Sequence, residues 1–220
     1  MRYLKGEPHA LPGHRGSLAG YPAQHFLFEV ERGVATLTLN RPERKNPLTF
    51  DSYAELRELF RAFARADDIQ AVVLAGSGDN FCSGGDVHEI IGPLTTMTMP
   101  ELLEFTRMTG DLVKAMRACP QPVLGAIDGI CAGAGAMMAL ACDMLVAARN
   151  AVFSVAYVKV GLTPDGGATA FLAQFLSRQL MTELCLLGER IGAERMHARG
   201  AVNRLTERGA ALAEALALAG

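Results

Sequence analysis

The chain has 220 residues, of which 50% are hydrophobic and 20% are charged, and its formal net charge is −2. This balance is typical of a globular protein that buries a sizeable core, and it argues against a disordered or collagen-like chain. The small charge gives no electrostatic case for nucleic acid as a partner, and the uncharged stretch 129–142 is too short for a membrane-spanning helix, which needs about 20 apolar residues.

Residues 1–24 hold several Gly, Pro and His residues and no apolar period, which predicts a flexible N-terminal arm. The rest of the chain, 25–220, is expected to form one domain, because no second boundary interrupts it. That domain opens with a β-hairpin. Segments 26–30 and 34–39 are its predicted strands, and they are joined by a turn.

A polar loop over 40–47 separates the hairpin from a helix over 51–66, in which apolar residues recur at helical spacing. The next run, 69–75, is continuously apolar, which is the pattern of a strand buried on both faces. It leads into a glycine-rich loop at 76–85. A second helix is expected over 100–118.

The second half of the chain repeats this order. A buried strand over 122–127 runs into the glycine-rich segment 129–135 and then into an apolar helix that ends near 141. Short strands and then helices follow, at 144–148, 152–155, 168–176, 177–187, 193–200 and 207–218. Because strand, glycine loop and helix occur twice in succession, we predict an α/β protein with stacked βα units.

The cysteines and histidines predict neither disulfides nor a metal site. The five cysteines are an odd number and no pair has C-x-x-C spacing, so we expect reduced, buried thiols in a cytoplasmic protein. The five histidines form no H-E-x-x-H or similar ligand pair, so we expect no protein-bound metal. The cysteines are Cys82, Cys119, Cys131, Cys142 and Cys185.

Two glycine-rich segments are unusual for a plain core. Phe81–Val87 and Gly129–Gly135 each follow a buried strand and lead toward a helix. Glycine allows a positive φ and close approach of the backbone to a ligand, and free N–H groups at a helix start attract an anion. Facing each other, the two segments would offer two N–H donors to a developing oxyanion. The alternative is that both are tight turns that let helices pack closely.

Five segments, in order along the chain, carry motifs of a known family. They are 40–48 (NRPERKNPL), 81–86 (FCSGGD), 122–143, 161–167 (GLTPDGG) and 187–193 (LGERIGA). On these residues the chain resembles the crotonase superfamily, also called the enoyl-CoA hydratase/isomerase family, over roughly residues 25–208.

The resemblance implies a crotonase-like spiral of ββα units that assembles as a homotrimer or hexamer. It also implies an acyl-CoA thioester as the substrate, with no separate cofactor. The two N–H donors of the family's oxyanion hole fall on Gly85 and Ala134, and the second position is usually glycine in the family. We expect the family's C-terminal helices to be shortened in this chain.

Three residues fall where family members contact CoA. Arg44 and Lys45 match the positions of basic or backbone contacts to the CoA phosphates, and Ser83 matches backbone that brackets the adenine. For Arg44 and Lys45 the alternative is an ordinary solvated loop.

The chain departs from the hydratases of this family at their two catalytic glutamates. Counted from Asp143, the first glutamate position holds Met137 and the second holds Tyr157. A thioether has no useful proton, and a phenol with a pKa of about 10 can at best donate one. Hydration by two glutamates is therefore not expected, and Met137 and Met138 are expected to line the core or the acyl pocket.

Asp165 is the carboxylate that remains in this region. Dienoyl-CoA isomerases of the family use an aspartate here as an acid/base, 4-chlorobenzoyl-CoA dehalogenases use it as a nucleophile, and naphthoate synthases share it while lacking both glutamates. A lone buried carboxylate has a raised pKa and suits a general base. The alternative is that Asp165 caps the helix that starts near Gly166. Tyr157 fills the space in which some naphthoate synthases hold bicarbonate, so we expect no bicarbonate dependence.

The remaining polar residues near these motifs have plainer interpretations. We expect His88 at the surface or in packing, although its pKa suits proton transfer, and we expect Asp86 and Asp143 to be a helix cap and a loop anchor. The sequence thus predicts an acyl-CoA enzyme that uses Asp165, assisted by Tyr157, on an unsaturated, cyclic or aromatic acyl group. Two rivals stay open: a hydratase rescued by Tyr157 or a water, and a degenerate paralogue that binds acyl-CoA, or stabilises a mixed oligomer, without chemistry.

Overall fold

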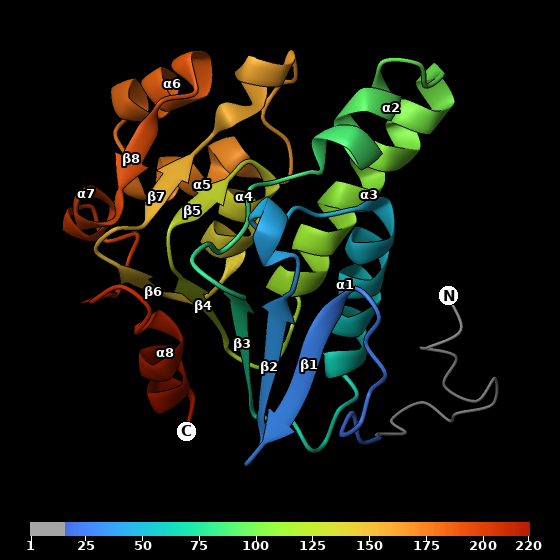
Figure 1. Ribbon diagram of the computed structural model, residues 1–220, viewed down its shortest axis with the longest axis vertical. Coiled ribbons are helices and arrows are strands. Elements are labelled where there is room, and N and C mark those ends of the chain that lie inside the picture. The colour runs from blue at the N-terminus through green and yellow to red at the C-terminus, as the bar shows by residue number, and fades with distance from the viewer. Residues whose placement is uncertain (1–15) are drawn as a thin grey trace.

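The computed structural model describes residues 16–220, which fold around two β-sheets with helices on both faces of the larger one (Figure 1). The larger sheet has the strand order β1-β2-β3-β4-β6-β9. Only β1 and β2 are antiparallel, and the other pairs are parallel. The strand bounds are β1 Phe26–Glu31, β2 Val34–Leu39, β3 Ala71–Gly76, β4 Val123–Ile127, β6 Met144–Ala148 and β9 Arg204–Thr206. The predicted hairpin and the α/β fold class are confirmed.

A smaller sheet lies in the upper left of Figure 1, near the helices of the C-terminal half. Its order is β5-β7-β8, with β5 (Ile130–Ala132) parallel to β7 (Val152–Ser154) and β7 antiparallel to β8 (Arg190–Gly192). β5 follows β4 after only two residues, so the second glycine-rich segment passes directly from one sheet to the other.

The helices differ in length and in the layer that they form. The bounds are α1 Phe50–Phe63, α2 Gly92–Leu94, α3 Met99–Arg117, α4 Ala134–Ala141, α5 Ala168–Phe175, α6 Arg178–Leu187, α7 Ala193–Ala198 and α8 Ala211–Ala219. Short 3₁₀ segments occupy Pro42–Arg44 and Ala156–Val160, and a π-helical turn occupies Val87–Ile91. No helix within residues 16–220 is long and apolar enough to cross a membrane.

The core sits on both faces of the larger sheet because its central strands are apolar at every position. On β3, Val72 and Leu74 belong to the main core cluster together with residues of α1 and α3, whereas Val73 and Ala75 point to the other face and pack with α8. Successive side chains of a strand point to opposite faces, so a strand covered on both sides needs a continuous apolar run. The burial predicted for this segment is confirmed.

Several predicted boundaries differ from the structure for local reasons. α1 begins at Phe50 because the Thr49 side chain accepts from the Ser52 amide, while the Ser52 hydroxyl accepts from the Thr49 amide. It ends at Phe63 rather than residue 66, where Ala66 instead pairs with Gly16. The last helix starts at Ala211, not at 207, and strands β5, β8 and β9 were missed because three residues show no period.

Residues 16–24 of the predicted arm lie against the domain, and residues 1–15 lie outside the described part. The buried Glu55 carboxylate accepts hydrogen bonds from the amides of Gln24 and His25, both at 2.9 Å. Asp68 accepts from the amides of Leu18 and Ala19. Two carboxylates of the domain therefore hold this segment through its backbone.

Candidate functional site: two loops and a buried carboxylate

The two glycine-rich segments touch each other at the carboxyl ends of β3 and β4. The first segment pairs with β5, since the Cys82 amide donates to the Ile130 carbonyl at 3.0 Å and the Ala132 amide donates to the Cys82 carbonyl at 2.9 Å. Gly84 and Gly133 have φ values of +101° and +51°, and a Cβ added to Gly84 would lie only 3.1 Å from the Ala132 carbonyl oxygen. Glycine adopts such φ values at low cost, and at Gly84 it also avoids this close contact.

Each segment carries a backbone N–H without an acceptor. The Leu48 amide donates to the Gly84 carbonyl and the Asp86 amide donates to the Leu48 carbonyl, both at 2.8 Å, which leaves out the Gly85 amide between them. Ala134 is the first residue of α4, where amides have no partner within the helix. Within residues 16–220 neither the Gly85 nor the Ala134 amide donates a hydrogen bond. A Cβ added to Gly84 would lie 3.6 Å from the Ala134 nitrogen, so the two donor segments are adjacent.

Asp86 anchors the first segment. Its buried carboxylate accepts from the His88 amide at 2.9 Å and the Glu89 amide at 3.2 Å, and pairs with Arg44 at 2.9 Å and Arg41 at 3.1 Å. Burial alone would raise its pKa, but the two amides and the two guanidinium groups outweigh burial and lower the pKa. The predicted cap role of Asp86 is confirmed.

Replacing Asp86 by alanine is expected to lower the free energy of unfolding by about 2–3 kcal/mol at neutral pH, because two arginines and two amides lose their acceptor. A carboxylate with a lowered pKa stabilises the fold above its unfolded pKa, and this contribution is lost as the pH falls through the folded pKa. The difference from the parent protein in urea unfolding should therefore shrink in acid. Glu89→Ala is the matched control, since Glu89 pairs with Arg41 but is half exposed, and it should change stability by less than about 1 kcal/mol.

Asp165 lies in the loop before α5, half-buried beside two hydroxyl groups. The Thr109 hydroxyl, on α3, donates to Asp165 Oδ2 at 3.2 Å. Burial raises the pKa of Asp165, and the nearby hydroxyls of Tyr157 and Thr109 only partly offset it. The Tyr157 hydroxyl is buried and close enough to affect this pKa, but it lacks hydrogen-bond geometry to any partner within residues 16–220.

Asp165 does not cap α5 with its side chain. The N-cap of α5 is Gly167, no side chain caps this helix, and only the backbone carbonyl of Asp165 contributes, by accepting from the Ala168 amide at 2.9 Å. The capping alternative for this carboxylate is therefore wrong. The half-buried acid has no structural role at the helix start that would explain its presence.

Tyr157 stays a neutral phenol in this environment. Burial raises its pKa above the ordinary value, and the charge of Asp165 raises it further. Tyr53 on α1 is also buried, and its pKa is raised well above its usual value by burial, by Asp165 and by Cys82. Sequence reasoning missed Tyr53 as a neighbour of Asp165, because it occupies an ordinary apolar position of an amphipathic helix.

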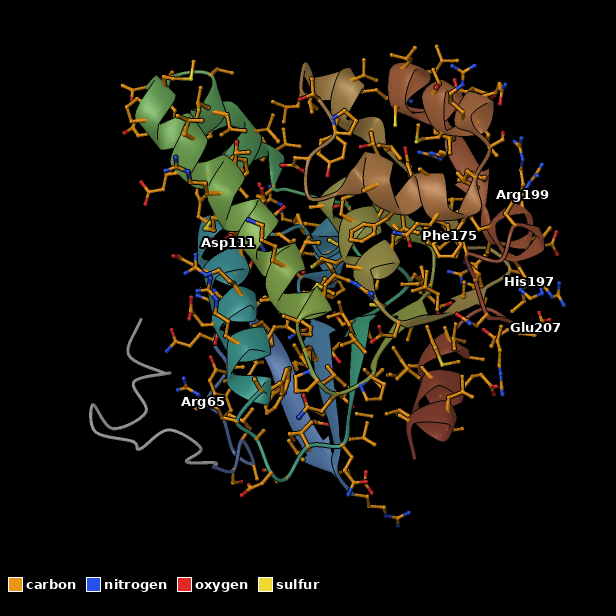
Figure 2. All side chains as sticks on the ribbon, turned by 180° about the vertical axis from the view of Figure 1, so that it is seen from behind. Arg65, Asp111, Phe175, His197, Arg199 and Glu207 are labelled. Atoms are coloured by element: carbon orange, nitrogen blue, oxygen red, sulfur yellow. The ribbon has the colours of Figure 1, made fainter. Side chains whose placement is uncertain are left out.

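Met137, on α4, borders the same loop. Its side chain is 1% exposed, and a Cβ added to Gly166 would lie 3.5 Å from it. α4 packs against both α3 and α5, which are marked in Figure 2 by Asp111 and Phe175. Thus α4 begins at Ala134, whose amide has no acceptor, and one turn later its Met137 lies beside the loop that holds Asp165 and Gly166.

The three residues predicted to contact CoA adjoin the first segment. The Ser83 amide donates to the Lys45 carbonyl at 2.9 Å and the Ser83 hydroxyl donates to the Arg44 carbonyl at 3.4 Å. The Arg44 guanidinium is occupied by Asp86. Lys45 is exposed and, within the described residues, has no ion-pair partner. Arg44 thus has a carboxylate partner, whereas the ammonium group of Lys45 is exposed to solvent.

Two further expectations concern neighbouring polar residues. His88 is exposed, as predicted. Asp143 accepts from the Val123 amide at 2.9 Å and pairs with Arg117 at 3.0 Å, which confirms its role as an anchor. A cavity of ≈ 370 Å³ lies between the start of β1, the 40–49 loop and the start of α1, and its lining includes neither Gly85, Ala134 nor Asp165.

The cysteines differ in burial, and none is in a disulfide. All five cysteines are unpaired. Cys82, Cys131 and Cys142 are buried as predicted, whereas Cys119 and Cys185 are only half-buried, because each lies near the end of a helix at the protein surface. Among residues 16–220, no three His, Cys, Asp or Glu side chains gather as a metal site.

The α/β fold with its two adjoining glycine-rich loops is that of the enoyl-CoA hydratase/isomerase family, and the chain belongs to this family. Residues 29–220 match the family model described as enoyl-CoA hydratase/isomerase. The family named by the sequence motifs is thereby confirmed.

Individual relatives carry both hydratase and isomerase names. The chain is 39% identical over 181 residues to 1,2-epoxyphenylacetyl-CoA isomerase of Escherichia coli, covering 81% of this chain and 68% of that protein. It is 31% identical to trans-2-decenoyl-[acyl-carrier-protein] isomerase of Streptococcus mutans, covering 84% and 70%. The crystal structure of an enoyl-CoA hydratase from Polaromonas sp. JS666 superposes with a TM-score of 0.82 at 40% identity, covering 89% and 76%. The chain spans 68% and 70% of the length of these two curated relatives, and 63% of a probable enoyl-CoA hydratase of Rhodobacter capsulatus.

Proposed function

We propose that the chain binds an acyl-CoA thioester whose carbonyl oxygen accepts hydrogen bonds from the Gly85 and Ala134 amides. The supporting observation is that these two amides lie on touching segments and have no acceptor within residues 16–220. Donors fixed in this way stabilise the negative charge that develops when a proton leaves the carbon next to the thioester, and each is worth about 3 kcal/mol in comparable sites. The thioester is the substrate, and the proposal invokes no cofactor or metal.

Asp165 is the proposed acid/base. It removes a proton from a carbon conjugated with the thioester, the C–H electron pair moves into the enolate, and the protonated Asp165 returns the proton to another carbon. The net result is a shifted double bond with all atoms conserved. Burial raises the pKa of Asp165 toward the range in which a carboxyl group both accepts and donates protons.

Isomerisation fits this site better than hydration does. By the motif resemblance, the two glutamate positions of the family's hydratases fall on Met137 and Tyr157, which would leave one carboxyl group in place of two. A single base suffices to move a proton between carbons, whereas hydration also requires activation of a water. The aromatic rings of Tyr53 and Tyr157 near Asp165 favour an unsaturated, cyclic or aromatic acyl group, and the isomerase names among the relatives support this choice.

Three alternatives make different predictions. A dehalogenase-like or naphthoate-synthase-like enzyme would use Asp165 on an aromatic acyl-CoA, and stimulation by bicarbonate would favour the second. A hydratase assisted by Tyr157 or a water would remove the ultraviolet absorbance of crotonyl-CoA at an ordinary rate. A paralogue without chemistry would bind acyl-CoA and leave it unchanged.

A panel of acyl-CoA thioesters, assayed by mass spectrometry in D₂O, distinguishes isomerisation from these three alternatives. Proton transfer through Asp165 exchanges deuterium into the acyl group without the mass change of an added water. Addition of water to crotonyl-CoA without exchange into β,γ-unsaturated or cyclic substrates would contradict isomerisation.

We further propose that Lys45, Arg44 and Ser83 contact the CoA nucleotide and that the protein works as a homotrimer or hexamer in the cytoplasm.

Tyr157→Phe is expected to keep turnover within a few-fold of the parent protein, because only a hydroxyl is lost and Asp165 keeps its hydrogen bond from Thr109. Since that hydroxyl helps to lower the pKa of Asp165, its loss should move the acidic limb of the kcat/KM profile to higher pH. A loss of turnover as large as that from changing Asp165 would show instead that the phenol donates a proton to the substrate.

A further inference from the structure

Thr109 is a buried hydroxyl that faces two acceptors. It lies on α3 and is 4% exposed. Its Oγ1 lies 3.2 Å from Asp165 Oδ2 and 3.0 Å from the Thr106 carbonyl oxygen. A threonine hydroxyl has one proton to donate and two lone pairs that accept. The hydroxyl therefore donates its proton to only one of these two oxygens at a time. The other oxygen must then donate a proton to Thr109 Oγ1 or go without this hydrogen bond.

The two contacts keep Thr109 bonded to Asp165 in each protonation state. When Asp165 is ionised, or carries the substrate's proton on Oδ1, the Thr109 hydroxyl donates to Oδ2. When the proton lies on Oδ2 instead, the acid donates to Thr109 Oγ1, and the hydroxyl turns its own proton to the Thr106 carbonyl. Neither state leaves Thr109 or the facing carboxyl oxygen without a partner, and a buried polar group without a partner is costly.

Other groups around the carboxyl cannot make this exchange. Tyr53, Tyr157 and Cys82 are the titratable groups that interact electrostatically within this cluster, and burial raises the pKa of each, that of Cys82 to about 12. All three stay neutral while Asp165 titrates. The Tyr157 hydroxyl, moreover, has no hydrogen-bond partner in the described part of the chain.

We propose that Thr109 is a positioning residue that holds Asp165 in one orientation through both halves of the proton-transfer cycle. The inference rests on the proposed function of Asp165. It adds that catalysis depends on a hydroxyl which itself touches no substrate, because the carboxyl must accept and release a proton without rotating away from the reacting carbons.

The test compares Thr109→Val with Thr109→Ser. Valine keeps the shape of threonine but removes both hydrogen bonds, and serine keeps the hydroxyl. We expect Thr109→Val to lower kcat by about tenfold or more, the scale of one hydrogen bond to a charged group. The acidic limb of the pH profile should also move to higher pH, because the ionised acid loses a donor. Thr109→Ser should restore both values.

An Asp165→Asn background separates the two proposals. There Thr109→Val should cost no further activity, because the group through which it acts is gone. If Asp165→Asn abolishes turnover while Thr109→Val changes neither kcat nor the pH profile, the positioning role is overturned and the role of Asp165 stands. If Thr109→Val lowers kcat without a pH shift and serine does not rescue it, Thr109 is only structural and the inference fails. Full activity of Asp165→Asn would overturn both proposals.

Discussion

Replacing Asp165 by asparagine is expected to lower turnover by about 100-fold or more, the scale of general acid–base catalysis. The amide has nearly the same shape as the carboxyl group but neither accepts a proton from carbon nor attacks carbon usefully. Because this side chain does not cap α5, the substitution should disturb neither the helix nor acyl-CoA affinity. Steady-state kinetics and calorimetric binding of a saturated acyl-CoA measure the two effects separately.

The same variant should be as stable as the parent protein or more stable. A carboxyl group whose folded pKa is raised stabilises the fold below its unfolded pKa, and this contribution is lost as the pH rises through the folded pKa. At neutral pH the parent therefore bears the cost of a half-buried charge that asparagine removes. Asp51→Asn, at an exposed aspartate of α1, is the matched control and should leave activity unchanged. Reduced stability together with full activity in Asp165→Asn would contradict the assignment.

Removing the donors of the proposed oxyanion hole should have the second large effect. Gly85→Pro deletes one N–H and should lower turnover by about 10²–10³-fold, as the loss of one such donor does elsewhere. Gly85→Ala keeps the N–H, and its Cβ would meet Ile90 at an ordinary 3.6 Å, so it should stay active. Equal activity of the folded proline and alanine variants would show that the thioester oxygen is not bound at Gly85.

Ala134→Pro supplies a second, independent donor test. Ala134 is the first residue of α4, where the missing N–H of a proline removes no helical hydrogen bond. Its turnover should fall as in Gly85→Pro. Both prolines follow a glycine of positive φ, Gly133 at +51° and Gly84 at +101°, so circular dichroism and urea unfolding are used to select the variants that fold. Full turnover in a folded proline variant would contradict the donor role of that amide.

The parts of the fold that the sequence predicted are those specified by local patterns. β3 and β4 were recognisable because both faces of a covered strand must be apolar, and α1 and α3 because their apolar residues recur at helical spacing. Strands of three residues, such as β8, depend on partners that are distant in sequence and show no pattern of their own.

The candidate site was predictable to the extent that the backbone motifs carry it. The glycine segments and Asp165 stand out in the sequence, but nothing local marks Thr109 as a neighbour of Asp165. The two are 56 positions apart, and their contact arises only when α3 packs beside the loop before α5. Tyr53 is likewise far from Asp165 in the sequence, so its apolar helical position predicted only a core residue.

The first segment is held between Leu48 and β5, so the residues that place its amides differ from the residues that surround Asp165. Its amides are placed by main-chain bonds from Leu48 and Cys82, whereas the groups beside Asp165 are side chains on α1, α3 and the segment after β7. Under the proposed function, mutations in those side chains would alter which carbon is deprotonated without moving the amides. A scaffold of this kind would acquire a new reaction by substitution at a few positions while it kept the amides that are proposed to bind the thioester oxygen.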